Sequence, residues 1–298
     1  MSKLFPTLLL TLASLPAWAN LNVFATVPEW ASLAREIGGD KVRVYSATNA
    51  FQDPHRIEAK PSLLAQARQA NLVVAAGADL EVGWLPLVLR DSGNAAIQAG
   101  RPGYFEAANF VSRLEVPTSV DRAQGDVHAA GNPHLHLDPR NVLKVGEALA
   151  GRMAELDAAN AVAYQAGYKS FAGKWQAAMA RWEKEAAPLR GVPVLVHHAS
   201  FLYLANWLGL KEVGTLEPKP GIEPTSGHLS SLLARQQTLP AKMVLRTAYN
   251  PDGPSQWIAG KTGLPAVLLP YTVGGTAEAK DLFGLFDDTV QRLLKGLR

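Results

Sequence analysis

The chain has 298 residues, with 29 Lys and Arg, 26 Asp and Glu and seven His, which gives a formal net charge of +3. A hydrophobic content of 48% and a charged content of 18% are typical of a globular protein and exclude a disordered chain. No run of Lys or Arg forms the basic stripe that nucleic-acid binding requires, so we expect no nucleic-acid partner. The length exceeds one average domain, and we expect two domains or one large α/β domain.

The chain begins with MSKLFPTLLLTLASLPAWAN, which has the pattern of a secretory signal. Lys3 supplies a positive charge, residues 4–15 form an apolar run, and Ala17 and Ala19 flank Trp18 in a cleavage motif. The run is shorter than the roughly 20 residues that a spanning helix needs. The sequence contains no Cys, hence no disulfide and no lipid-acceptor residue. We predict a signal peptide over residues 1–19 and a periplasmic, monomeric protein that is not lipid-anchored.

The next segment alternates between strand and helix patterns. LNVFAT (21–26) and KVRVYSA (41–47) read as strands, and the helix pattern between them places Trp30, Leu33 and Ile37 on one face. PSLLAQARQA (61–70) then reads as a helix and NLVVAAGADL (71–80) as a buried strand. This order predicts a parallel sheet covered on both faces, and we assign residues 20–139 to an N-terminal α/β lobe.

A long helical stretch follows Pro139, pauses near Asp157 and resumes from residue 161 to residue 189. Apolar residues recur in it at spacings of three and four, which gives one apolar face over at least four turns. We assign residues 140–188 to a linking helical region that contains a spine helix crossing between two lobes.

The strand and helix alternation restarts after Pro193, and we assign residues 189–298 to a C-terminal α/β lobe. VPVLVHHAS, AKMVLRTAY and LPAVLLPY read as strands, separated by helices and closed by the amphipathic AKDLFGLFDDTVQRLLKGL. The predicted fold class is α/β, with two lobes that each contain a mainly parallel sheet flanked by helices. Ligands bind at the carboxyl ends of such strands, so we expect a site in the interlobe cleft.

Three histidines fall on predicted strand-to-helix connections. His55 follows the second strand, His134 precedes the spine helix, and His198 ends a strand of the second lobe. Imidazole is the commonest metal ligand among side chains, and these connections are where distant residues converge. Three imidazoles at roughly 2.0–2.1 Å from an ion, with a carboxylate or water in the fourth position, suit Zn²⁺. We therefore predict a metal site made by His55, His134 and His198.

Four motifs in order make the chain resemble the cluster A-I solute-binding proteins of metal-importing ABC transporters, the zinc- and manganese-binding proteins of the periplasm. DPHRIEAKPS resembles their DPHxxExxPS ligand loop and implies His55 as a ligand. NPHLHLDPRN is similar to the second ligand segment, H-x-W-x-D-P, and implies His134, with His136 where an aromatic residue is common. VLVHHASFLYLANWLGL resembles their H-x-x-x-x-Y segment, with His198 as ligand and Tyr203 in the Tyr place, and GIEPTSGHLSSLL resembles their E-P-S helix start.

The chain departs from the resemblance after the final strand. The family often supplies an acidic fourth ligand there in a D-P step, but this sequence reads LLPYTVGG, with Leu269 before Pro270. Water, Asp252 or Glu223 is left for the fourth position. Loss of the acid favours zinc over manganese, because manganese prefers oxygen donors. His198 points the same way, since manganese members often carry an acid in that place.

The remaining histidines have other expected roles. His197 points to the opposite face of its strand from His198 and is expected to be packed in the core. His136 is expected to alternate away from the site, with joining the metal as the lesser alternative. His128, with Asp126, belongs either to a solvated loop or to a weak metal-capture loop. His228 is expected at the surface.

Two carboxylates are candidates for orienting the ligands, because a metal-bound imidazole usually donates its second N–H to a carboxylate or carbonyl. Glu58 is the candidate for His55. Asp138 either does the same for His134 or caps the helix that follows it.

The resemblance implies a periplasmic receptor that captures a divalent transition metal, Zn²⁺ before Mn²⁺. It would deliver the ion to a membrane permease driven by a cytoplasmic ATPase. The alternative is an exported zinc-dependent hydrolase. The sequence shows no H-E-x-x-H helix, Ser elbow or paired-carboxylate segment, so we expect no enzyme and assign no catalytic residue.

Overall fold

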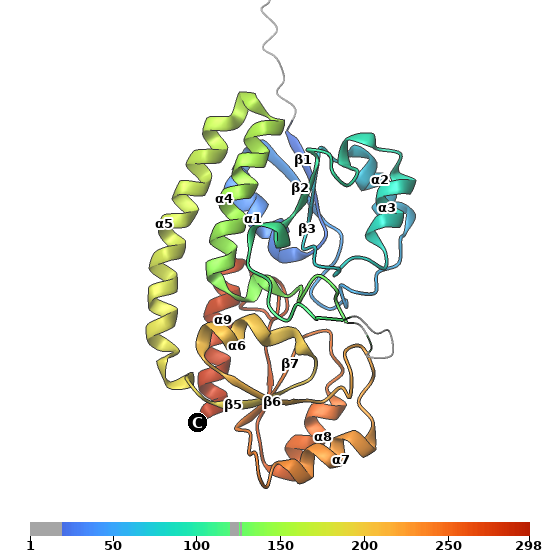
Figure 1. The fold of residues 1–298 in the computed structure, drawn as a ribbon. Helices are drawn as coiled ribbons and strands as arrows, with labels where there is room; N and C mark the ends of the chain where they lie inside the picture. The colour runs from blue at the N-terminus through green and yellow to red at the C-terminus, as the bar shows by residue number, and fades with distance from the viewer. Residues whose placement is uncertain (1–19, 120–124, 126) are drawn as a thin grey trace, which may run out of the picture.

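Figure 1 shows a computed structural model, which describes residues 20–119, 125 and 127–298. The predicted signal peptide, residues 1–19, and Asp126 lie outside these residues. Two lobes are stacked beside one long helix, and each lobe contains a four-stranded parallel sheet. This arrangement confirms the predicted α/β class with two lobes.

The N-terminal sheet has the strand order β2-β1-β3-β4. Its strands and helices are β1 (Leu21–Ala25), α1 (Pro28–Gly38), β2 (Val42–Ser46), α2 (Pro61–Gln69), β3 (Leu72–Ala75), α3 (Leu85–Ser92) and β4 (Tyr104–Glu106). Side chains alternate across the strands, so Val23 packs with α1 on one face while Phe24 packs with α2 and α3 on the other. Pro residues open all three helices, where the missing N–H has no partner to lose.

The C-terminal sheet repeats this topology with the order β6-β5-β7-β8. Its elements are β5 (Pro193–Val196), α6 (Leu202–Leu208), β6 (Lys211–Thr215), α7 (Ser226–Arg235), β7 (Met243–Arg246), α8 (Gly253–Thr262), β8 (Ala266–Leu268) and α9 (Leu282–Leu297). In both sheets the first strand of the lobe lies between the second and the third. Crossovers therefore leave it in opposite directions, which opens a crevice at its carboxyl end.

The linking region is a hairpin of two helices, α4 (Pro139–Leu156) and α5 (Ala161–Glu185). The chain turns at Asp157, whose carboxylate accepts hydrogen bonds from Asn160 Nδ2 at 2.8 Å and Tyr164 Oη at 2.7 Å. Only α5 runs the full distance between the lobes, while α4 lies beside the N-terminal lobe (Figure 1). The expected pause near Asp157 is thus a reversal of chain direction. The hydrogen bonds that Asp157 accepts from Asn160 and Tyr164 hold the tight turn between the two helices.

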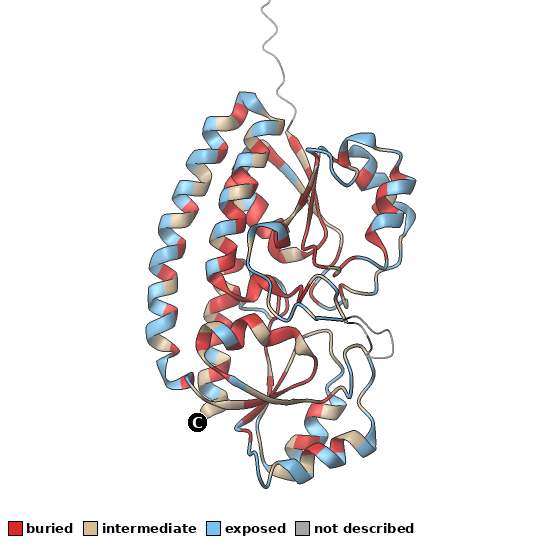
Figure 2. Cartoon of the chain, viewed as in Figure 1, coloured by how far each residue is buried: buried red, intermediate tan, exposed pale blue. Residues whose placement is uncertain are grey.

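One continuous apolar core joins the two lobes. Trp175 and Trp182 of α5 pack against Phe286 of α9, with ring centroids 5.3 and 5.0 Å apart. Figure 2 shows buried residues on the inner faces of α4 and α9, while much of α5 faces solvent. The shared core fixes the position of one lobe relative to the other and so presets the cleft. Among the described helices, none is both long and apolar enough to cross a membrane.

Candidate metal centre

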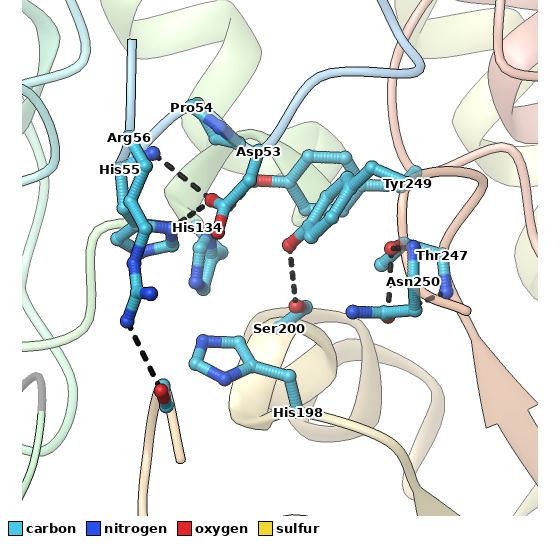
Figure 3. Close-up of polar contacts among 12 residues, drawn as sticks. Asp53, Pro54, His55, Arg56, His134, His198, Ser200, Thr247, Tyr249 and Asn250 are labelled. Atoms are coloured by element: carbon cyan, nitrogen blue, oxygen red, sulfur yellow. Dashed lines mark hydrogen bonds and ion pairs between the residues drawn. The ribbon is translucent and has the colours of Figure 1, made fainter. Parts of the chain in front are cut away.

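The three histidines predicted as ligands converge between the lobes (Figure 3). His55 lies in the loop between β2 and α2, His134 precedes the short 3-10 helix Leu135–Leu137, and His198 follows β5. Each offers one nitrogen, and these nitrogens lie within 4.8 Å of one another. The ring centroids are 5.3 to 5.6 Å apart. The structure therefore brings together residues from both lobes at one point.

The cluster is shielded from solvent. His134 is 1% exposed and His198 is 7% exposed. The Nε2 atom of His55 is buried and has no hydrogen-bond partner among the described residues. A buried nitrogen without a partner is costly unless a ligand or an ion satisfies it. The site thus fits a cation that accepts nitrogen lone pairs.

Carboxylates orient two of the rings. Asp53 Oδ1 lies 2.6 Å from His55 Nδ1 and also accepts the His55 backbone N–H at 3.0 Å, which is an Asx-turn. Burial opposes ionisation of Asp53, but its hydrogen bonds and charge interaction with His55 hold its pKa below the ordinary value. Glu217 Oε2 lies 2.7 Å from His198 Nδ1 and accepts the Gly221 N–H at 2.8 Å. Both rings are held through Nδ1, which leaves Nε2 for an ion.

A phenol orients the third ring. His134 Nδ1 lies 2.8 Å from the hydroxyl of Tyr271, and the His134 backbone N–H donates to Asn132 Oδ1 at 3.0 Å. Burial lowers the pKa of His134 well below its ordinary value, and the neighbouring His55 and His198 lower it further. His134 is therefore neutral at physiological pH, the form that ligates metal.

The expected role of Glu58 is wrong. Its side chain is exposed and lies 3.9 Å from Lys60 Nζ, while Asp53 contacts His55 in its place. The available signal was an Asp two residues before His55, the spacing of an Asx-turn. For Asp138 the capping alternative is confirmed, because its carboxylate accepts the Arg140 N–H at 2.9 Å at the start of α4.

Tyr203, which the resemblance placed in the family's Tyr position, holds the segment before His134. Its hydroxyl donates to the Asn132 carbonyl at 2.9 Å and accepts the Leu114 N–H at 3.1 Å. Asn132 Nδ2 also donates to the Ala199 carbonyl at 3.0 Å. Asn132 was not singled out from the sequence, and it links the two lobes directly beside the cluster.

Three further histidines lie outside the cluster. His136 Nε2 faces the Tyr271 carbonyl at 2.9 Å and its Nδ1 lies 3.1 Å from Glu29 Oε1, so neither nitrogen points to the cluster. The alternative that His136 joins the metal is therefore wrong in this structure. His197 is buried as expected, and burial lowers its pKa to about 4. His228 is half-buried on α7, apart from the cluster.

His128 lies against the cluster. Its ring stacks on His55 with centroids 5.2 Å apart. It lines a cavity of about 180 Å³ together with His134 and His198. The solvated-loop alternative is thus wrong for His128, because stacking holds it at the wall of the site.

The two acids considered for the fourth position lie outside the cluster. Asp252, before α8, and Glu223 are both exposed. Glu223 lines a second cavity, of about 250 Å³, beside His55 and His198. Leu269 is fully buried. Within the described part of the chain, the nitrogen cluster holds three imidazoles and no carboxylate.

Imidazole nitrogens gathered between two braced α/β lobes define a metal-binding solute-binding protein. The family model described as ZnuA, zinc-uptake complex component A, periplasmic, matches residues 23–296. The chain belongs to this family.

Curated relatives and solved structures agree with this assignment. The chain is 22% identical over 291 residues to the metal ABC transporter substrate-binding lipoprotein ScbA of Streptococcus cristatus, which covers 94% of this chain and 89% of the relative. It is also 22% identical over 291 residues to the manganese ABC transporter substrate-binding lipoprotein PsaA of Streptococcus anginosus, which covers 93% and 89%.

Two solved structures share the fold. A crystal structure of ZnuA matches with a TM-score of 0.77 and 23% identity, over 94% of this chain and 100% of that chain. A manganese-bound periplasmic metal binding protein from Candidatus Liberibacter asiaticus matches with a TM-score of 0.75 and 15% identity, over 93% and 99%. These likenesses confirm the two-lobe fold.

Family membership confirms the expected class. The family consists of periplasmic metal-binding substrate-binding proteins of ABC transporters and not of enzymes. The expectation that the protein is not lipid-anchored is contradicted, because the streptococcal relatives are named lipoproteins. That expectation was based on the absence of a lipid-acceptor Cys from this sequence. The absence of Cys here does not tell how the related proteins are attached to the membrane.

Proposed function

We propose that this protein binds Zn²⁺ through His55, His134 and His198 and delivers it to the membrane permease of an ABC importer, driven by its ATPase. The observation that carries the proposal is the convergence of three imidazole nitrogens from two lobes within 4.8 Å. Each ring is held through Nδ1 by another side chain, which leaves Nε2 for the ion.

The donor set favours zinc. Zn²⁺ binds neutral imidazole in tetrahedral sites, whereas Mn²⁺ prefers carboxylate and carbonyl oxygen. The relatives include proteins named for manganese, while the family model is named for zinc uptake. Because Asp252 and Glu223 lie outside the cluster, we propose water as the fourth ligand.

We also propose the domain limits that the sequence indicated, each with a part in this function. Residues 1–19 would direct export, residues 20–139 and 189–298 would form the two lobes, and residues 140–188 would link them. The monomeric state stays a prediction.

Metal analysis tests the proposal. Protein purified without chelator or added metal should retain zinc at about one ion per chain, by the one-site geometry. In competition at equal concentrations, zinc should displace manganese. Retention of manganese in the presence of excess zinc would contradict the choice of zinc.

A turnover assay separates this receptor from a zinc hydrolase, which would also keep an open coordination position. The zinc-loaded protein should leave model esters and peptides unchanged. Metal-dependent hydrolysis that disappears in His134→Ala would overturn the assignment.

A further inference from the structure

The segment after β8 reads LPYTVGG and contains Tyr271. Tyr271 is 3% exposed and its backbone has a φ of 64°, a conformation that bulky residues rarely adopt. Such strain persists only when surrounding contacts hold it in place. The contacts of Tyr271 therefore indicate what the strained conformation achieves.

Buried polar groups of the N-terminal lobe hold this segment from both sides. The Tyr271 carbonyl accepts a hydrogen bond from His136 Nε2 at 2.9 Å, and Thr272 Oγ1 donates to Glu29 Oε2 at 2.5 Å. Glu29 Oε1 in turn lies 3.1 Å from His136 Nδ1. Every one of these side chains is 3% exposed or less. The four residues form a closed ring of contacts that fixes the Tyr271 backbone.

The fixed backbone presents the Tyr271 hydroxyl to His134 Nδ1 at 2.8 Å. A neutral imidazole carries one proton, so Nε2 can donate its lone pair to an ion only when Nδ1 carries the proton. In that tautomer Nδ1–H donates to the phenol oxygen. The other tautomer would place the proton on Nε2, where it blocks coordination.

We propose that Tyr271 is a positioning residue that orients the His134 ring and accepts the Nδ1–H of its ligating tautomer, and that Glu29, His136 and Thr272 hold it in place. This inference rests on the proposed metal-binding function. His55 and His198 are each oriented by a carboxylate of their own lobe, Asp53 and Glu217. Among the three ligands, His134 alone receives its orienting group from the opposite lobe.

A phenol beside His134 accepts the imidazole N–H without adding a third carboxylate to Asp53 and Glu217. The C-terminal lobe therefore contributes orientation through Tyr271 and a ligand through His198.

The test compares Tyr271→Phe with the matched control Tyr249→Phe. The ring of Tyr249 lies 5.4 Å from that of Tyr271, and its hydroxyl contacts Ser200 Oγ at 3.3 Å rather than a histidine. Zinc affinity is measured by competition with a chelator, and the His134 tautomer by long-range ¹H–¹⁵N NMR of the metal-free protein. Circular dichroism and melting temperature check that both variants fold.

Tyr271→Phe should bind zinc about 10- to 100-fold more weakly, the usual cost of removing a group that orients a ligand. Its His134 should shift from the Nδ1–H tautomer toward Nε2–H, while Tyr249→Phe keeps the wild-type affinity and tautomer. Wild-type affinity in Tyr271→Phe, or an equal loss in Tyr249→Phe, would overturn the proposal. Failure of the wild-type protein to bind zinc would instead overturn the proposed function.

Discussion

His55 and His198 come from opposite lobes, and their ring centroids lie 5.6 Å apart. The loop of His55 also touches the connection between β6 and α7 of the other lobe, where Arg56 Nη2 donates to the Gly221 carbonyl at 3.0 Å. Gly221 donates its own N–H to Glu217, the carboxylate that orients His198. The hydrogen bond from Arg56 across the cleft is thus connected through Gly221 and Glu217 to the position of His198.

Replacing any one of the three ligands should reduce zinc affinity strongly. His55→Ala, His134→Ala and His198→Ala should each weaken binding by about 100-fold or more, since an apparent binding energy of about 10–16 kcal/mol is shared among four ligands. Isothermal titration with a competing chelator measures the change. His228→Ala is the control, because His228 Nε2 contacts only the Thr215 carbonyl, at 2.9 Å, in the described structure. Equal losses in all four variants would contradict the ligand assignment.

Removing a carboxylate that orients a ligand should have a smaller effect. Asp53→Asn and Glu217→Gln keep the side-chain shape but lose the charge that accepts the imidazole N–H. We expect zinc affinity to fall by about 10- to 100-fold in each. Glu58→Gln, which alters an exposed carboxylate in the same loop as Asp53, should bind as wild type. An effect of Glu58→Gln as large as that of Asp53→Asn would refute the role given to Asp53.

Removing the contact across the cleft should speed metal release. Arg56→Ala deletes the hydrogen bond to Gly221 and so frees the loop that carries Glu217. Because Arg56 is exposed, we expect only a several-fold faster dissociation of zinc, measured by stopped-flow with excess chelator. Lys60→Ala, whose partner Glu58 lies in the same lobe, should leave the rate unchanged. An unaltered rate in Arg56→Ala would show that the contact does not retain the ion.

Two buried groups should give opposite pH dependences of stability in the metal-free protein. Burial raises the pKa of Glu81 to about 7, although hydrogen bonds from Thr26, Ala76 and Gly77 lower it. The folded protein then keeps a proton that the unfolded chain has lost. The unfolding free energy should fall by about 3 kcal/mol from this source as pH rises from 4.5 to about 7.

His197 has the reverse sign, because burial lowers its pKa from 6.5 to about 4. The unfolding free energy should therefore fall from this source as pH falls from 6.5 to about 4, because the unfolded chain takes up a proton that the folded protein does not. Urea unfolding should show that the unfolding free energy of Glu81→Gln rises relative to that of wild type as pH rises from about 4 to 7. The fall in unfolding free energy that His197 causes in wild type as pH falls through the same window should be absent from His197→Gln. Parallel stability profiles in the three proteins would disprove the assignment of these two groups.

The sequence predicted the fold well where apolar periodicity was strong. The strands around Val23, Val74 and Val244 are buried on both faces and read as continuous apolar runs. The edge strands β4 and β6 were missed, because β4 has three residues and β6 contains Lys211, Glu212 and Gly214. Such edge strands have no apolar pattern to detect.

The candidate site was predicted less evenly. The three histidines were recognisable because each lies next to a Pro or at a strand end, where the chain positions a side chain for convergence. The groups that orient them were harder to find, since Glu217 and Tyr271 are remote in sequence from His198 and His134. Only Asp53 carried a local signal, its spacing of two residues from His55.

We infer that imidazoles of both lobes bind one ion. A crystal of the zinc-loaded protein, with anomalous diffraction collected at the zinc absorption edge, would locate that ion. We predict a single peak at about 2.0–2.1 Å from Nε2 of His55, His134 and His198. A peak bound by residues of one lobe alone would contradict the account.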